Sequence, residues 1–266
     1  MKLSSPLTIA GNLLSLSLCT LLLYPALAQA QIGLPVPTIA GPAVAAKAAA
    51  PVDFTGTWVS IVNEDWRWRM RTPAKADYDS VLTLNADGRA EADKWEVSQD
   101  GSCKAFGAAG LMRMPTRLQI SWADDFTLKI VSDAGMQTRL LRFTASGGIA
   151  AAPASPSLQG FSLASWQLPA SYRPGPNAAP PANGSLSVTT TNMIPAWLRR
   201  NGVPYSAQTV LTEYFDTFAI PGGERWLVVT SIVDDPVFHN GRFITSSHFR
   251  HEADNAKWNP EACKND

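Results

Sequence analysis

The sequence lacks the short motifs that mark the commonest catalytic sites. It contains no Gly-x-Ser-x-Gly nucleophile elbow, no phosphate-binding loop, no dinucleotide fingerprint and no His-Glu-x-x-His zinc helix. Histidine is also scarce, since the chain has only three, His239, His248 and His251. Residues three apart on a strand face opposite sides, so His248 and His251 should diverge. We therefore predict no metal site and no cofactor.

An excess of charge of one sign is missing as well. The chain has 22 basic and 22 acidic residues. A nucleic-acid-binding surface or a broadly charged membrane-binding face needs an excess of basic residues, so this balance argues against both. After the N-terminal leader, no run is apolar enough to span a bilayer, and we expect a soluble mature chain without a transmembrane segment. The oligomeric state is left open.

The N-terminal residues indicate export. Residues 1–28 combine a basic Lys2, an apolar stretch over Leu13–Leu23 and small-residue cleavage patterns ending at Ala28 and Ala30. This arrangement is typical of a secretory signal peptide. We therefore expect a bacterial protein that is periplasmic or secreted.

The three cysteines are consistent with an oxidising compartment. Signal cleavage would remove Cys19 and leave Cys103 and Cys263. An even pair in such a compartment predicts one disulfide, which would join the end of the chain to a loop near its middle. Two separate buried thiols are the alternative.

The rest of the chain divides into a linker and a β-rich body. Residues 29–51 are almost all Ala, Pro, Gly and small apolar residues, which predicts a disordered linker. Residues 52–266 form the expected single domain. Its short alternating segments and frequent turns predict an antiparallel sandwich or barrel with one or two short helices and Pro-rich loops. The expected strands are 59–62, 66–71, 79–84, 117–122, 126–132, 136–143, 160–167, 186–191, 210–218, 224–234 and 243–252. The expected helical segments are 86–96, capped by Asn85, and a short turn over 195–201.

The segment 66–71 alternates without interruption between large apolar side chains and arginine. An extended strand would place the three apolar side chains on one face and the three arginines on the other. The apolar set is Trp66, Trp68 and Met70, and the basic set is Arg67, Arg69 and Arg71. The pattern therefore predicts an aromatic wall backed by a row of cations.

Three interpretations of the arginine row remain open. Outward arginines would be solvated and paired with carboxylates such as Glu64, Asp65 and Asp77. An inward row would favour an anionic ligand, because the guanidinium fork matches carboxylate or phosphate, and Arg139 could join it by alternation with Leu140. The third interpretation is a protein-contact surface, where exposed Trp and Arg are typical anchors.

One weak catalytic hypothesis rests on His248 and Glu213. A histidine oriented by a carboxylate could do acid–base chemistry, and the hairpin beside His248 carries Glu213 and Asp216. On a regular strand either Glu213 or its neighbour Tyr214 must point inward. The alternative is an outward Glu213 that pairs with a cation across strands.

Two resemblances bear on the fold. Gly56-Thr57-Trp58, at the start of the first strand, resembles the opening Gly-x-Trp of lipocalins, which implies a barrel with a cavity for a small, mostly apolar ligand. A longer ordered set of motifs resembles an uncharacterised family of exported, β-rich proteins from proteobacteria and acidobacteria. That resemblance implies export and a β-rich fold, and no particular activity. The motifs are Leu84-Asn85-Ala86-Asp87-Gly88, Gln137-Thr138-Arg139, Leu158-Gln159-Gly160, Gly202-Val203-Pro204-Tyr205-Ser206, Thr212-Glu213-Tyr214 and Val233-Asp234-Asp235-Pro236.

From these observations we expect an exported soluble protein that binds a small hydrophobic or amphiphilic ligand, whose polar end would be anionic. The candidate ligand-binding residues are Trp66, Arg67, Trp68, Arg69, Arg139 and Tyr214. One alternative is an envelope enzyme of hydrolase or isomerase type that uses His248 with a carboxylate. Another is a protein-interaction module of the cell envelope.

Overall fold

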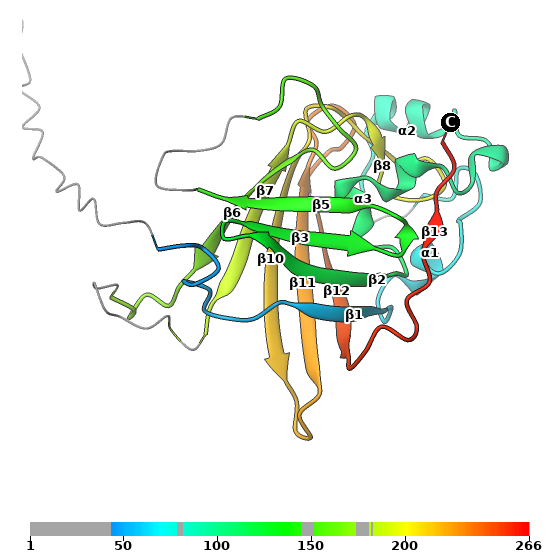
Figure 1. The fold of residues 1–266 in the computed structure, drawn as a ribbon. Coiled ribbons are helices and arrows are strands. Elements are labelled where there is room, and N and C mark those ends of the chain that lie inside the picture. Colours follow the sequence, from blue (N-terminus) through cyan, green and yellow to red (C-terminus); the bar gives the residue numbers. More distant parts are fainter. Residues whose placement is uncertain (1–43, 79–81, 145–151, 174–180, 182, 266) are drawn as a thin grey trace, which may run out of the picture. The chain divides into compact units, whose positions relative to one another are not determined.

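A closed β-barrel forms the body of the protein (Figure 1). The structure is a computed structural model and describes residues 44–78, 82–144, 152–173, 181 and 183–265. Within these residues, nine strands pair in the order β1-β12-β11-β10-β7-β6-β5-β3-β2, and β2 pairs again with β1. The all-β prediction is confirmed, and the barrel holds rather than the sandwich. The strands are β1 Gly56–Ile61, β2 Arg117–Asp124, β3 Thr127–Ser132, β5 Thr138–Phe143, β6 Phe161–Gln167, β7 Ser185–Thr191, β10 Val210–Ala219, β11 Arg225–Asp234 and β12 Phe243–Glu252.

The odd number of strands explains one unusual pairing. Neighbours in a closed ring cannot all run antiparallel when their number is odd, so one pair must be parallel. That pair is β5 with β6, whose register places Leu141 opposite Ser162. Parallel neighbours need a crossover of a dozen or more residues, and the connection over residues 144–160 provides it.

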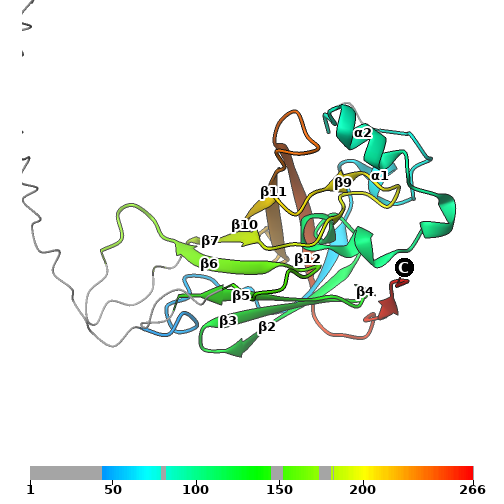
Figure 2. The ribbon, with the colours of Figure 1, turned by 90° about the horizontal axis from the view of Figure 1, so that it is seen from above.

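Short elements gather at one end of the barrel, as the two views agree (Figure 1 and Figure 2). We call residues 62–78, 82–116 and 192–209 the cap. It holds α1 Trp66–Arg69, α2 Ala86–Ala92, α3 Ala108–Leu111, the 3-10 turns Val97–Gln99 and Cys103–Phe106, and the paired strands β8 Ala196–Trp197 and β9 Pro204–Tyr205. Outside the cap, β4 Ala134–Gly135 pairs with β13 Glu261–Ala262. Among the described residues no helix is long and apolar enough to cross a membrane.

Two sequence predictions about these elements are wrong. Residues 66–69 are a single helical turn followed by a bend, not a strand over 66–71. Residues 195–201 contain β8 and a turn into β9, not a helical turn, because Leu198 donates its amide to the Val203 carbonyl and closes a hairpin. In the expected strand 79–84, residues 79–81 lie outside the described residues, and Leu84 forms an isolated bridge with His239.

The barrel interior carries a polar belt between two apolar clusters. On β10, Phe215 belongs to one cluster, Leu211 to the other, and Glu213 lies between them. The same change occurs around Ser231 on β11 and Ser247 on β12, and β3, β5, β6 and β7 each carry a buried polar residue as well. The belt residues are Ser132, Arg139, Ser162, Thr190, Glu213, Ser231 and Ser247, each at most 4 % exposed. Uncompensated burial of such groups is costly, and within the belt Arg139 donates to Glu213 and Thr190 while the Ser162 and Thr190 hydroxyls share a hydrogen bond of 2.8 Å.

Two contacts hold the ends of the described chain against the barrel. Cys103 and Cys263 form a disulfide with their Cα atoms 4.9 Å apart, as the sequence predicts. Residues 1–43, which include the expected signal peptide, lie outside the described residues. Residues 44–51, which the composition assigns to a linker, pack on the barrel, because Ala46 is 7 % exposed and its carbonyl accepts a hydrogen bond from Trp166 Nε1 at 2.9 Å. The folded part therefore begins before residue 52.

Candidate functional site

The helical turn α1 reverses the burial that a strand would have produced. Asp65, in the left-handed region with φ 49°, begins the turn, and its carbonyl accepts from the amides of Trp68 and Arg69. Trp66 is consequently 64 % exposed, whereas Arg69 is 3 % exposed. Arg67 stays at the surface and pairs with Asp77 at 3.1 Å.

The buried Arg69 side chain uses two of its three nitrogens. Its Nε donates to the carbonyl oxygen of Arg113 at 2.8 Å, and its Nη1 donates to Glu64 Oε1 at 3.0 Å. Its Nη2 is buried and has no hydrogen-bond partner among the described residues. The carbonyl oxygen of Arg69 accepts from Arg200 Nη2 at 3.0 Å, so the surrounding segments fix the position of this guanidinium.

Three segments of the cap bring four arginines together. We call Arg69, Arg113, Arg199 and Arg200 the arginine cluster, which lines a cavity of about 10 Å³ together with Trp68, Met114 and Leu198. Arg113 follows α3 and donates to Asp65 Oδ2 at 2.8 Å and to Thr245 Oγ1, inside the barrel mouth, at 2.7 Å. Arg199 and Arg200 come from the turn between β8 and β9.

The positive charges of the cluster oppose one another. Burial, followed by the like charge of Arg113, lowers the pKa of Arg69 to about 10, against the opposing effect of Glu64 and Asp65. Burial also lowers the pKa of Arg200, although Asp100 acts in the other direction. A negative ion in the cavity would relieve both effects, because it favours the charged guanidinium. The cluster is therefore electrostatically suited to an anion.

The structure brings only part of the predicted ligand-binding set together. Arg67, Trp68 and Arg69 lie at the cluster or beside it. Arg139 lies in the barrel belt, where its Nη1 and Nη2 donate to Glu213 at 3.1 and 2.6 Å. Tyr214 is 37 % exposed on the outer face of β10.

The three histidines lie in different places. His248 points outward from β12, and its Nδ1 is 3.0 Å from Glu64 Oε2, while Glu213 points into the barrel. The His239 Nε2 lies 3.0 Å from the Pro204 carbonyl oxygen. His251 packs edge-on against Trp58, and burial and then the charge of Arg225 lower its pKa. In the part of the chain that the structure describes, no three His, Cys, Asp or Glu side chains could jointly hold a metal ion.

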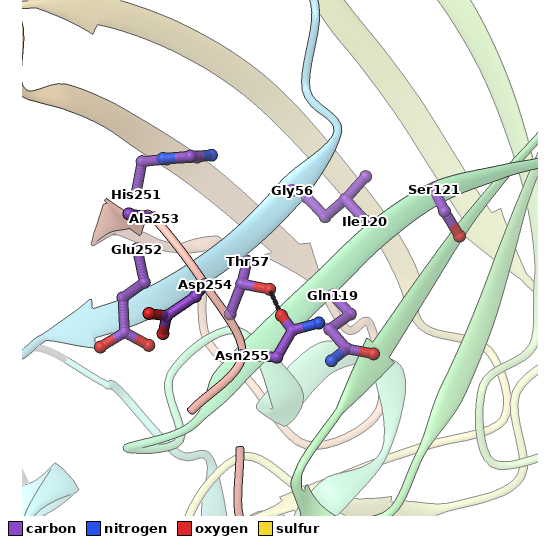
Figure 3. A pocket seen from close by; sticks show the side chains of 10 residues that line it. All are labelled: Gly56, Thr57, Gln119, Ile120, Ser121, His251, Glu252, Ala253, Asp254 and Asn255. Carbon is purple, nitrogen blue, oxygen red and sulfur yellow. Dashed lines mark hydrogen bonds between the residues drawn. The ribbon is translucent and has the colours of Figure 1, made fainter. Parts of the chain in front are cut away.

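A second, larger hollow lies outside the barrel, where the chain after β12 passes β1 and β2. Figure 3 shows this groove, which measures about 340 Å³. The Thr57 hydroxyl donates to the Asn255 side-chain oxygen, and Glu252 accepts from Arg117 Nε at 2.8 Å. None of its lining residues, all of which the structure describes, is Arg or Lys, so the groove offers no cation to an anionic ligand. The lining residues are Gly56, Thr57, Gln119, Ile120, Ser121, His251, Glu252, Ala253, Asp254 and Asn255.

Sequence reasoning missed Arg113, Arg199 and Arg200. The adjacent Arg199-Arg200 pair is the one local signal, and it does not distinguish a buried cluster from a solvated turn. The link between the segments exists only in the fold, because Arg200 contacts a backbone oxygen 131 positions away. Comparisons with protein-family models, with curated proteins and with solved structures found no match to this chain.

Proposed function

We propose that this protein binds a small anionic ligand at the arginine cluster. The observation that carries the proposal is the buried Nη2 of Arg69: Arg69 lines the cavity, and this nitrogen has no partner among the described residues. An unpartnered buried donor on a charged group is costly, and an anion would accept its hydrogen bond. The buried Nε of Arg200 lacks a described partner in the same way and supplies a second donor.

The packing of the barrel interior favours a small anionic ligand over the larger amphiphilic ligand that the sequence suggests. Interior side chains such as Leu118, Ile130 and Leu141 expose none of their surface. Protein interiors packed in this way have no room for an added alkyl chain. The cap is therefore the better place for a ligand than the barrel lumen. The acid–base alternative finds less support, because His248 points outward from β12, where its carboxylate partner is Glu64, and Glu213 lies on the other side of the barrel wall.

Thermal unfolding in different sodium salts tests this proposal. Ionic strength is held constant with gluconate, while chloride, acetate, sulfate or laurate is titrated into the wild type and two variants, Arg69→Gln and Arg200→Gln. At 100 times the dissociation constant a bound anion stabilises the fold by about 2.7 kcal/mol, so we expect the melting temperature to rise with at least one anion. Both variants should lose most of that rise.

The matched control is Arg242→Gln, because Arg242 is a surface arginine whose side chain is 67 % exposed and paired with Asp234. This variant should keep the full response. The proposal is wrong if no anion stabilises the wild type, or if Arg200→Gln, with a native near-ultraviolet spectrum, responds like the wild type. If Arg69→Gln does not fold, the response of Arg200→Gln to the anion still tests the proposal.

We further propose that the protein is exported and that its signal peptide is removed near Ala28 or Ala30. The disulfide supports this proposal, because such bonds persist in oxidising compartments. Expression of the full chain with a C-terminal tag, followed by mass spectrometry of the purified protein, tests it. We expect a new N-terminus after Ala28 or Ala30 in the periplasmic fraction. An intact N-terminus in the cytoplasmic fraction would contradict export.

A further inference from the structure

The cavity inside the arginine cluster is very small. Its volume of about 10 Å³ is close to the least that holds one water-sized particle. A monatomic anion such as chloride is larger than a water molecule but is the smallest of the candidate anions, whereas acetate and sulfate have several heavy atoms. In the described arrangement, only a monatomic anion could reach Arg69 Nη2 with minor adjustment of the walls.

Two of the seven residues that line this cavity keep part of their surface exposed to solvent. The other five lining residues, Arg69, Arg113, Met114, Leu198 and Arg199, are each at most 8 % exposed. Trp68 and Arg200 are only partly buried. Arg200 donates from its Nη2 to the Arg69 carbonyl oxygen, so moving its side chain would break that hydrogen bond. The Trp68 side chain can move without breaking a hydrogen bond to the cluster.

The indole of Trp68 is held in place by cations. The guanidinium carbons of Arg67 and Arg199 each lie 4.7 Å from its ring centroid. Cation–π contacts of this kind are worth about 0.5–2 kcal/mol each, which is enough to favour one position and too little to lock it. The helix that carries Trp68 has four residues and no side-chain hydrogen bond at its N-cap. A helix of this length contributes little stability of its own.

We propose that Trp68 is a specificity-determining residue that sets the size of the anion accepted by the arginine cluster. With the indole in place, the site takes a monatomic anion and discriminates against multi-atom oxyanions. This inference rests on the proposed function, since it assigns a ligand class to the same site.

Isothermal titration with chloride, bromide and sulfate tests the inference in the wild type and in Trp68→Leu. Leucine keeps the wall apolar and removes most of its volume. We expect the wild type to bind chloride about tenfold or more tighter than sulfate, and Trp68→Leu to reduce that ratio about tenfold or more, mainly by tighter sulfate binding. The matched control is Trp66→Leu, the same substitution two residues earlier at a side chain that is 64 % exposed and does not line the cavity.

The outcomes separate this inference from the proposed function. If the wild type binds sulfate as tightly as chloride, or if Trp66→Leu changes the ratio as much as Trp68→Leu, Trp68 does not set the size limit and the inference is overturned. Anion binding at the cluster would still stand in that case. If neither the wild type nor Trp68→Leu binds any of the three anions, the proposed function fails, and the inference fails with it.

Discussion

At the residue scale, the most consequential interaction in the barrel is the Arg139–Glu213 ion pair. Both side chains are 0 % exposed, and the pair is bidentate, with a further hydrogen bond from Arg139 Nη2 to Thr190 Oγ1 at 3.3 Å. Removing one charge leaves the other uncompensated in the core. We therefore expect Glu213→Gln to lower the free energy of unfolding by about 3–5 kcal/mol, measured by urea denaturation.

A double variant shows how much of this loss is the lone charge. In Arg139→Met with Glu213→Leu, both charges are replaced by apolar side chains of similar size. Such replacements of buried pairs are commonly neutral or stabilising by about 1–4 kcal/mol, so the double variant should be at least as stable as the wild type. A Glu213→Gln variant within about 1 kcal/mol of the wild type would contradict a charged, desolvated pair.

Contacts of single residues also explain why the sequence predicted only part of the candidate site. It identified Arg69 as a candidate but assigned it by alternation to an exposed or lumen-facing row. A buried arginine needs partners, and those of Arg69 include the Arg113 carbonyl, 44 positions away. No local pattern contains that information. The sequence likewise suggested ligand binding for Arg139 and catalysis for Glu213. It does not show that these two residues, 74 positions apart, contact each other.

At the element scale, alternation predicted the barrel strands because each has one buried and one exposed face. The burial of β3 alternates without exception from Thr127 to Ser132. Asn85 was also identified correctly as a helix cap, since its side-chain oxygen accepts from the Gly88 amide at 2.8 Å. The prediction failed at α1, where Trp66 is exposed and Arg69 is buried. An alternating sequence shows only that apolar and polar residues take turns along the chain. It indicates a strand only where the apolar side chains are the buried ones.

Asp235 joins several elements, and its charge should make the fold sensitive to acid. It directly follows β11, is 3 % exposed and accepts hydrogen bonds from four donors. Burial would raise the pKa of Asp235, but these hydrogen bonds outweigh it and hold the pKa below its ordinary value. The donors are Thr209 Oγ1 and the amides of Ser206, Val237 and Phe238.

The sign of the pH effect follows from that shift. An unfolded aspartate ionises near pH 3.9, so the stabilisation is complete well above about pH 4 and is lost as the pH falls through the lower folded-state pKa. We expect Asp235→Asn to lower the free energy of unfolding by about 1.5–3 kcal/mol at neutral pH, and by progressively less towards about pH 3. Urea denaturation across this range measures it. Asp234→Asn is the control, because Asp234 is a more exposed neighbour paired with Arg242 at the surface. An Asp235→Asn deficit that stays constant with pH would refute the assigned role.

At the scale of the whole molecule, the sequence predicted a β barrel or sandwich but not how the strands close. Closure requires β1 to pair with both β2 and β12, and the latter pairing places Trp58 opposite His251. These partners are far apart along the chain, and hydrophobic alternation is the same in a sandwich and in a barrel. The cap could not be predicted for the same reason, since the contacts that join its segments link residues far apart in the sequence.

The disulfide should contribute substantially to the stability of the whole chain. Cys103 and Cys263 are 160 positions apart, and their bond fixes the last residues against the cap and β4. For a loop of this length the chain-entropy account gives about 5 kcal/mol, and measured losses are typically about 2–5 kcal/mol. We expect Cys103→Ser with Cys263→Ser to lower the free energy of unfolding by that amount in urea denaturation, and a reducing agent to bring the wild type to the same value. The opposite outcome is that reduction lowers the free energy of unfolding of the wild type by less than about 1 kcal/mol. That result would mean that the β4–β13 pairing alone holds the C-terminal segment. It would also contradict the entropic account, in which the cross-link restricts the unfolded chain.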